Sequence, residues 1–346
     1  MKIAIIGGAG FIGINSAYYF LEREHEVIIL DNLSRVGSEY NLNQIREKFN
    51  VPFIQVDIRD FNAIRDNLKS LGALDGVLLL AGQVAVTTSV RNPREDFDIN
   101  AMGTLNVLEA LRTNKQFPLL IYSSTNKVYG KMGQATVTER DGRYEYEHLV
   151  QGINEETQLD FYSPYGCSKG AGDQYVRDYS RIYQLPTVVM RQSCIYGHRQ
   201  FGIEDQGWVA WFTIAALLGK EVTIYGDGKQ IRDILFVEDL VRLYELAFKN
   251  KKECFGKIYN VGGGPNQTMS LNELIKFLSK RFDRPIKLRN DDWRPGDQKV
   301  YVSDISKVSY DLGWKPAIGI DEGIDRMTSW IVENRNILEK YVFNRS

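Results

Sequence analysis

The chain has 346 residues, of which 43% are hydrophobic and 25% are charged, and its formal net charge is −1 at pH 7. This composition is typical of a globular protein, and the length favours one large domain with a smaller lobe. So small a net charge excludes a general electrostatic attraction to nucleic acid or to a membrane surface, and we expect neither partner.

Three cysteines and three histidines are scattered along the chain, so their spacing predicts no metal site. Glycines interrupt the apolar run at the N-terminus, which argues against a signal peptide. The chain has no run of about 18 apolar residues elsewhere, so we expect no membrane span. We therefore expect a cytoplasmic protein with reduced thiols.

Short apolar runs alternate with amphipathic stretches in the first half of the chain. The apolar runs predict strands at 2–6, 26–31, 52–56, 76–81, 118–123 and 186–191. The amphipathic stretches predict helices at 11–23, 40–48, 60–70, 95–114 and 163–183. Continuous apolar strands separated by helices indicate an α/β fold, with a Rossmann-type doubly wound parallel sheet over residues 1–191.

After residue 192 the apolar segments become shorter and turn signals become frequent. Two helices are predicted here, at 208–218 and 270–281, with Ser270 as a plausible N-cap of the second. We predict a smaller, mixed α/β substrate lobe over 192–346, from which later segments can return strands to the first sheet.

The first predicted strand runs into a glycine-rich turn and then a helix. Gly7 allows the tight turn, Gly10 lets the main chain approach a pyrophosphate, and Gly13 lets helix and strand pack closely. The second strand ends at Asp31, 18 residues after Gly13, where a carboxylate can bind the adenosine ribose hydroxyls. Because Asp31 would repel a 2′-phosphate, the pattern favours NAD over NADP.

A phenol and an ammonium lie one helical turn apart in Tyr165-Gly-Cys-Ser-Lys169, and so share a helix face. A nearby cation lowers the pKa of a tyrosine, which could then take a proton from a sugar hydroxyl as hydride leaves the same carbon. Such pairs are common on surface helices, but here a buried strand also opens into the hydroxyl-rich segment that includes Thr125. Together with the glycine-rich turn and Asp31, this set of residues is a more specific signal than the Tyr165 and Lys169 pair alone.

With further motifs, the chain resembles the extended short-chain dehydrogenase/reductase family of nucleotide-sugar epimerases and dehydratases over essentially its whole length. These motifs are at residues 57–60 (DIRD), 100–104 (NAMGT), 224–233 (IYGDGKQIRD), 236–239 (FVED), 259–262 (YNVG), 294–297 (RPGD) and 312–316 (LGWKP). Within the family, segments 81–89, 123–130 and 163–169 are similar to members that invert C2 of a CDP-hexose.

The resemblance implies tightly bound NAD, a nucleotide diphosphate sugar (CDP-hexose) as substrate, a transient keto sugar with no net redox change, and a homo-oligomer, either dimer or tetramer. It implies that Thr125 binds the reacting sugar oxygen, that Tyr165 is the base and then the acid, and that Lys169 binds the nicotinamide ribose. The implied cofactor contacts are Gly7, Gly10, Phe11, Ile12, Gly13, Asp31, Asn32, Ser34, Arg35, Asp57, Ile58, Leu80, Ala81, Gln83, Asn100, Ser123, Tyr165, Lys169 and Gln192.

The substrate contacts are expected mainly in the lobe. Arg232 and Arg294 are the candidate diphosphate ligands, because guanidinium groups match phosphate oxygens and both arginines lie in glycine-rich segments. The full set of expected contacts is Val86, Thr125, Asn126, Cys194, Arg199, Gln206, Tyr225, Arg232, Arg294 and Asp297.

Several reactions remain open within this resemblance. Sugar 4,6-dehydratases of the family carry an Asp-Glu pair where this chain has Asn126 and Lys127, so dehydration is disfavoured. A 4-epimerase or another nucleotide-sugar oxidoreductase would need the same hydroxyl, phenol and ammonium. A non-catalytic NAD sensor is disfavoured because Tyr165 and Lys169 are both present. The choice of C2 rests on the resemblance alone.

Overall fold

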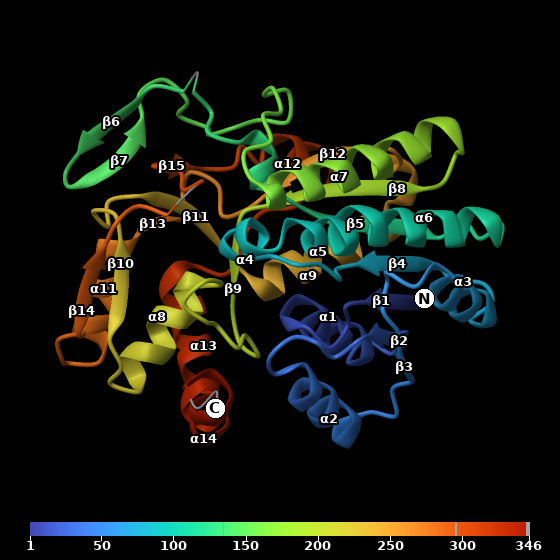
Figure 1. Cartoon of the computed structure of the whole chain (residues 1–346), viewed down its shortest axis with the longest axis horizontal. Coiled ribbons are helices and arrows are strands. Elements are labelled where there is room, and N and C mark those ends of the chain that lie inside the picture. Colours follow the sequence, from blue (N-terminus) through green and yellow to red (C-terminus); the bar gives the residue numbers. More distant parts are fainter. Residues whose placement is uncertain (134, 295, 344–346) are drawn as a thin grey trace.

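A seven-stranded sheet forms the centre of the protein in this computed structural model, which describes residues 1–133, 135–294 and 296–343. The strand order is β12-β8-β5-β4-β1-β2-β3, and every neighbouring pair is parallel. The strands are β1 (Lys2–Ile6), β2 (Glu26–Asp31), β3 (Phe53–Gln55), β4 (Gly76–Leu79), β5 (Leu119–Thr125), β8 (Thr187–Gln192) and β12 (Ile258–Val261). The predicted Rossmann-type fold is confirmed (Figure 1).

Helices cover both faces of this sheet because successive strand residues point to opposite sides. Ile3 and Ile5 belong to one buried cluster, and Ala4 and Ile6 belong to the other. The first cluster includes α1 (Phe11–Leu21), α2 (Ser38–Lys48), α9 (Val237–Lys249), α10 (Lys251–Cys254) and α12 (Ser306–Leu312). The second includes α3 (Phe61–Ser70), α6 (Gly103–Thr113) and α7 (Pro164–Ile182).

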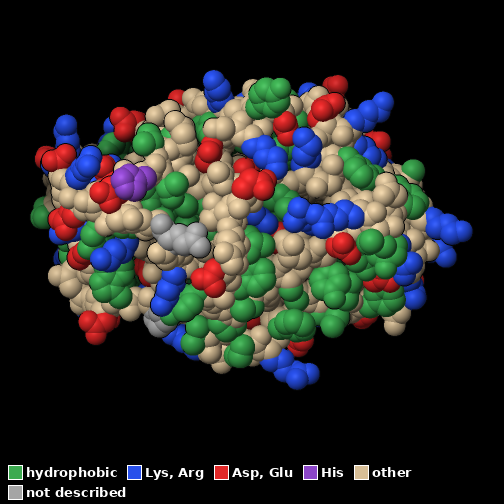
Figure 2. Space-filling view, turned by 90° about the horizontal axis from the view of Figure 1, so that it is seen from above, with side chains coloured by type: hydrophobic (Ala, Val, Ile, Leu, Met, Phe, Trp, Pro, Cys, Tyr) green, Lys and Arg blue, Asp and Glu red, His purple; other side chains and the backbone are tan. Residues whose placement is uncertain are grey.

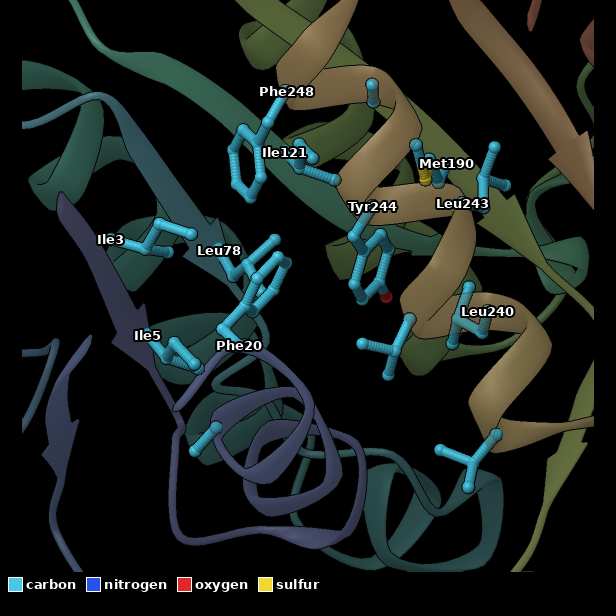
Figure 3. Packing of buried hydrophobic residues seen from close by; sticks show 14 of the residues in the cluster. Ile3, Ile5, Phe20, Leu78, Ile121, Met190, Leu240, Leu243, Tyr244 and Phe248 are labelled. Atoms are coloured by element: carbon cyan, nitrogen blue, oxygen red, sulfur yellow. The ribbon is translucent and has the colours of Figure 1, made fainter. Parts of the chain in front are cut away.

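Aromatic side chains fill the space between the sheet and its first helical layer. Phe20 of α1 and Phe248 of α9 have ring centroids 5.9 Å apart, and both are buried against the strands. Figure 3 shows these rings with Tyr244 of α9 beside Ile3 and Leu78 of the sheet. This packing fixes α1, whose N-terminus follows the glycine-rich turn.

The helix predicted at 95–114 consists of three pieces. They are α5 (Pro93–Phe97), the π-helical η1 (Asp98–Met102) and α6, with α4 (Val86–Arg91) immediately before them. The π-helical turn lies where Asn100 turns its side chain inward to the backbone of Gln83. Such turns often mark functional sites, and sequence periodicity does not reveal them.

The lobe lies beside the sheet, at the left in Figure 1. Its strands are β9 (Cys194–Tyr196), β10 (Val222–Tyr225), β11 (Ile231–Phe236), β13 (Thr268–Ser270), β14 (Leu288–Asp291) and β15 (Val300–Tyr301). Its helices are α8 (Trp208–Leu217), α11 (Leu271–Arg281), α13 (Ile320–Glu333), α14 (Arg335–Leu338) and the π-helical η3 (Glu339–Phe343). The predicted cap of α11 is confirmed, because Ser270 and Glu273 form a reciprocal capping box.

Elements cross the predicted division at 191/192 in both directions. Strand β12 and helices α9 and α12 return from the second half to the large sheet. The hairpin of β6 (Val137–Arg140) and β7 (Arg143–Tyr146) instead contacts the lobe, where the Tyr146 phenol donates to the Val300 carbonyl at 2.9 Å. The division itself stays a prediction. Among the described residues, no helix has the length and apolar character needed to cross a membrane.

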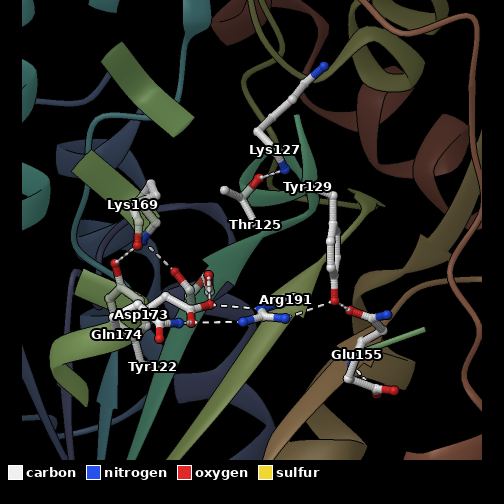
Figure 4. A network of polar contacts seen from close by, with 12 residues as sticks. Tyr122, Thr125, Lys127, Tyr129, Glu155, Lys169, Asp173, Gln174 and Arg191 are labelled. Carbon is white, nitrogen blue, oxygen red and sulfur yellow. Dashed lines mark hydrogen bonds and ion pairs between the residues drawn. The ribbon is translucent and has the colours of Figure 1, made fainter. Parts of the chain in front are cut away.

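A buried ion pair fastens α7 to the sheet. Arg191 of β8 donates to both carboxylate oxygens of Asp173 of α7, at 2.9 and 3.1 Å, and the side chains are 2% and 0% exposed. Ser124 of β5 donates to the same carboxylate at 2.7 Å. Arg191 also donates at 3.0 Å to Tyr129, at the end of the 3₁₀-helical η2 (Asn126–Tyr129). This network joins β5, β8, η2 and α7 (Figure 4).

We expect Asp173→Asn to lower the free energy of unfolding by about 3–5 kcal/mol, because it leaves the Arg191 charge buried without its partner. Asp178→Asn is the matched control, since Asp178 lies on the same helix and is exposed. Urea unfolding measures both. Equal free energies for the two variants would show that the pair does not anchor α7.

Candidate active site

A cavity of about 380 Å³ opens where strands β4, β5 and β8 end, between the sheet and the lobe. Open parallel sheets bind their ligands at this edge. The cavity brings together Thr125 and Tyr165 from the first half of the chain with Arg232 and Arg294 from the second. Residues that the sequence separates by 67 to 169 positions therefore face one ligand-sized space.

The predicted catalytic residues meet at one end of this cavity. Tyr165 is 7% exposed, its side chain faces the same cavity as Thr125, and its backbone N–H donates to the Ser89 hydroxyl at 3.1 Å. Lys169 is 5% exposed, and its ammonium donates to the Ser123 carbonyl. Helix α7 carries the phenol and the ammonium on the same buried face, as their spacing predicts.

Burial dominates the electrostatics of the pair. It raises the pKa of Tyr165 to about 12, against the opposing effects of the nearby Thr125 side chain and the Arg35 charge. Burial also lowers the pKa of Lys169 to about 7, although the Asp173 charge opposes this. The Lys169 ammonium donates to the Ser123 carbonyl here, and its expected effect on the pKa of Tyr165 stays a prediction.

The glycine turn has the shape that a pyrophosphate needs. Gly7 has φ +86°, and a Cβ there would lie 2.5 Å from the Ala81 amide, so only glycine fits. A Cβ at Gly13 would overlap the Gly7 carbonyl. At Gly10, by contrast, the nearest atom to a Cβ would be 3.4 Å away, and no side chain caps α1. The helix N-terminus therefore presents its amides beside open space, as anion binding requires.

The carboxylates predicted for the adenosine end lie after β2 and β3. Asp31 is 7% exposed and accepts hydrogen bonds from two backbone amides at 3.0 and 2.7 Å, while burial raises its pKa. Asp57 accepts from Asn32 at 2.9 Å, and its hydrogen-bonded ion pair with Arg59 lowers its pKa to about 2. Both groups are held in place before any ribose or adenine arrives.

The other expected cofactor contacts fall into three groups. Phe11, Ile12, Leu80, Ser123 and Gln192 line the cavity itself. Ser34 and Arg35 are exposed in the loop after β2, whereas Ile58 is buried against Gly103. These positions follow one edge of the sheet, which is where a dinucleotide bound to the glycine turn would extend.

A buried polar cluster positions the loop after β4. The Gln83 backbone N–H donates to Asn100 at 3.0 Å, and the Gln83 side-chain amide donates to Asp96 at 2.9 Å. Ser168, next to Lys169 on α7, donates to the other Asp96 oxygen at 2.5 Å. Sequence reasoning missed Asp96 and Ser168, although Asp96 and Asn100 have helical i, i+4 spacing. Gln83 and Asn100 are positioning residues here, and their contact with a cofactor stays a prediction.

The lobe supplies the cationic end of the cavity. The Arg294 guanidinium lies 3.7 Å from the Tyr225 ring centroid and 3.2 Å from an Asp205 oxygen. Arg232 is 8% exposed and pairs with Asp297 at 2.6 Å. A guanidinium has five N–H groups, so one carboxylate partner leaves donors for phosphate oxygens.

Val86, Asn126, Cys194 and Gln206 also line this cavity, as expected. Burial raises the pKa of Cys194, which keeps its thiol neutral and fits a small pocket-lining residue. Gln230 was missed, although its side-chain Oε1 is buried without a hydrogen-bond partner and the residue lines the cavity. Such an acceptor can receive a hydrogen bond from a ligand. Within the described residues, no group of His, Cys, Asp and Glu side chains is arranged to hold a metal ion.

Comparisons with known proteins agree with this geometry. The sequence profile described as GDP-mannose 4,6 dehydratase matches residues 4–327. The CDP-paratose 2-epimerase of Salmonella typhi is 44% identical over 335 residues, which cover 95% of this chain and 99% of that protein. The chain belongs to the nucleotide-sugar epimerase and dehydratase family of extended short-chain dehydrogenases/reductases.

Solved structures of this family share the whole fold. The UDP-glucose 4-epimerase of Thermotoga maritima, solved with UDP-glucose, has a TM-score of 0.82 and 31% identity and covers 97% of this chain and 100% of that one. The UDP-glucose 4-epimerase of Thermus thermophilus, solved with NAD, has a TM-score of 0.80 and 29% identity. The match covers 96% of this chain and 99% of that one. The predicted family and fold class are confirmed.

Arg199 does not line this cavity, and its contact with a substrate stays a prediction. Its guanidinium donates to Asn15 of α1 at 2.9 Å and lies 4.0 Å from the Tyr18 ring centroid, in a separate hollow that does not include the catalytic residues. The backbone at Arg199 is left-handed, with φ +62°. The residue therefore joins the substrate-lobe loop to the dinucleotide-binding helix of this family fold.

The glycine turn gives a direct test of dinucleotide binding. Gly10→Ala should unfold at the temperature of the parent but retain less NAD, because its methyl group occupies the open space beside the α1 amides. Gly13→Ala should instead lower the unfolding temperature, because its methyl group overlaps the turn. NAD released from the purified proteins and thermal unfolding measure the two effects. Full NAD content in Gly10→Ala would contradict this site.

Proposed function

We propose that this protein is an NAD-dependent nucleotide-sugar epimerase that inverts C2 of a CDP-hexose. The observation that carries the proposal is a single cavity lined by Thr125, Tyr165 and buried Lys169 from the sheet side and by Arg232 and Arg294 from the lobe. Proton transfer to a sugar hydroxyl and diphosphate binding need such groups within one ligand length.

The chain's own residues perform the proton chemistry. When bound, NAD supplies a hydride acceptor, a returning hydride and a positive charge beside the phenol. Thr125 holds the oxygen of the reacting hydroxyl, and Tyr165 as phenolate takes the proton from it. After the keto sugar presents its other face, Tyr165 returns the proton to the new hydroxyl. Lys169 holds the nicotinamide ribose in this proposal.

The substrate and the reacting carbon rest on the relatives. The relative at 44% identity is named as a CDP-paratose 2-epimerase, and a solved neighbour holds UDP-glucose. Asn126 and Lys127 replace the acidic pair of the sugar dehydratases, so this cavity lacks the carboxylates for elimination of water at those positions. A 4-epimerase or a net oxidoreductase would use the same Thr125 and Tyr165.

A panel of CDP-, UDP- and GDP-hexoses, followed by NMR, distinguishes these reactions. We expect one CDP-hexose to equilibrate with its C2 epimer without net consumption or formation of NADH. Inversion at C4 would replace the proposed reaction with 4-epimerisation. Formation or consumption of NADH equal to product would make the protein an oxidoreductase.

We also propose a homo-oligomer, because apolar side chains remain exposed on neighbouring helices. Val90 of α4, Phe97 of α5, Met102 of η1 and Tyr175 of α7 are 42–52% exposed, and these helices pack against one another. Figure 2 shows hydrophobic side chains gathered on part of the face seen from above. A second copy would bury such a surface.

We place the enzyme in the cytoplasm. Cys167, Cys194 and Cys254 are free thiols, which fits a reducing compartment. Nucleotide sugars and NAD would both be available to it there.

Tyr165→Phe removes one hydroxyl and keeps the buried ring. We expect turnover to fall by about 10²- to 10⁴-fold, the usual contribution of a general acid–base, while NAD content and unfolding temperature stay unchanged. Because the phenolate is the reactive form and burial raises its pKa, parent activity should rise with pH on the acid side. The matched control is Tyr175→Phe, on the exposed face of the same helix. Near-parent turnover in Tyr165→Phe would remove Tyr165 from proton transfer.

Arg294→Ala should weaken binding of CDP by about 10- to 100-fold, as expected for the loss of charged hydrogen bonds worth about 1.5–3 kcal/mol. Titration calorimetry measures this affinity. Arg281→Ala on α11 is the control, because its side chain is 48% exposed and pairs with Asp325 outside the cavity. Unchanged CDP affinity in Arg294→Ala would contradict the diphosphate assignment.

A further inference from the structure

Lys127 is a cavity-lining ammonium to which the catalytic scheme gives no role. It lies two residues after Thr125, and its backbone N–H donates to the Thr125 hydroxyl at 3.2 Å. Its side chain is partly buried and lines the same cavity as Tyr165 and Arg232. In Figure 4 this side chain extends away from Thr125 and from the buried network beneath α7.

The ammonium has weak acceptors in the protein. Its closest ones are the Gly296 carbonyl and the Gln298 side-chain oxygen, both at 3.4 Å. Among the residues that the structure describes, no carboxylate lies within 4.0 Å of it, and Asp297 is engaged by Arg232 at 2.6 Å. An ammonium has three N–H groups, and leaving them poorly paired in a buried place costs free energy. A ligand oxygen would remove that cost.

The surrounding charges locate this ammonium between the two halves of the site. Burial and, to a smaller extent, the Arg232 charge lower the pKa of Lys127 to about 8, while the Asp297 charge opposes them. Lys127 is therefore mostly charged at pH 7. It is joined through the chain to Thr125 at the reacting end, and it lies within electrostatic reach of Arg232 at the diphosphate end.

We propose that Lys127 is a specificity-determining residue that binds the hexose 1-phosphate half of the substrate. Its ammonium donates to an oxygen acceptor there, either a hexose oxygen or an oxygen of the phosphate attached to the hexose. The inference rests on the proposed function, because it needs a nucleotide sugar in this cavity. It explains why this chain has a partly buried cation where a dehydratase of this family has an acid, because the ammonium binds the hexose phosphate half and takes no proton from carbon.

Three nucleotides separate the two possible acceptors. CMP lacks the phosphate that joins the hexose, CDP contains it, and CDP-glucose contains both phosphate and hexose. We would titrate each into NAD-loaded parent, Lys127→Met and Lys127→Arg, with Lys131→Met as the matched control because Lys131 is exposed in the following segment. UDP and UDP-glucose are titrated alongside, in case uridine is the preferred base.

We expect Lys127→Met to bind CMP as the parent does and to lose at least tenfold in affinity for CDP-glucose. A similar loss with CDP identifies the phosphate as the acceptor, and an unchanged CDP affinity identifies the hexose. Lys127→Arg, which keeps the charge, should recover part of the loss. Parent-like binding of CDP-glucose by Lys127→Met would overturn this inference alone. A parent that binds none of the nucleotide sugars would overturn the proposed function, and this inference with it.

Thermal unfolding at several pH values separates binding from folding. The pKa of Lys127 is about 8 in the folded protein and 10.5 ordinarily, so the unfolded chain binds more protons between these values. The cost of burying the charge is full below pH 8 and disappears as the pH rises to about 10.5. Lys127→Met should therefore be at least as stable as the parent at pH 7, with any advantage vanishing near pH 10.5. A variant clearly less stable at pH 7 would make Lys127 a structural residue and overturn the proposal.

Discussion

The ion pair between Asp173 and Arg191 is the constraint on which the geometry of the site depends. Its charges are almost fully buried, so each requires the other at hydrogen-bonding distance. Asp173 lies one helical turn after Lys169 and two turns after Tyr165, and the pair therefore fixes both the height and the rotation of α7 against β8. That placement brings the Tyr165 phenol to Thr125, where β5 ends.

Burial then gives the two ends of the cavity different chemistry. At the sheet end, Tyr165 and Lys169 are enclosed. Burial raises the pKa of Tyr165 and lowers the pKa of Lys169, which favours the neutral form of each. At the lobe end, Arg232 and Arg294 each keep a carboxylate partner and remain cationic. A nucleotide diphosphate sugar has the matching polarity, with a neutral hexose at one end of an anionic diphosphate. In the proposed reaction, proton transfer and anion binding would take place in different parts of a single cavity.

The sequence predicted the parts of this site that depend on local pattern. Strands β1 and β2 and the roles of Gly7 and Gly13 follow from apolar runs and from the backbone space that glycine allows. The lobe was less predictable, because β9 and β15 have only three and two residues and both pair with β11 through contacts distant in the chain. Side-chain direction was the least predictable feature. An arginine such as Arg199 can bind a phosphate or contact a helix, and only the structure shows that it donates to Asn15 of α1.

The central claim is that Thr125 and Tyr165 serve a reversible oxidation in which the hydride returns to the carbon it left. The most direct measurement uses CDP-hexose labelled with deuterium at C2, incubated with NAD-loaded protein in ordinary water and followed by NMR. The account predicts an inverted C2 that still carries deuterium. Loss of the deuterium to solvent during inversion, or reaction that leaves C2 untouched, would contradict it.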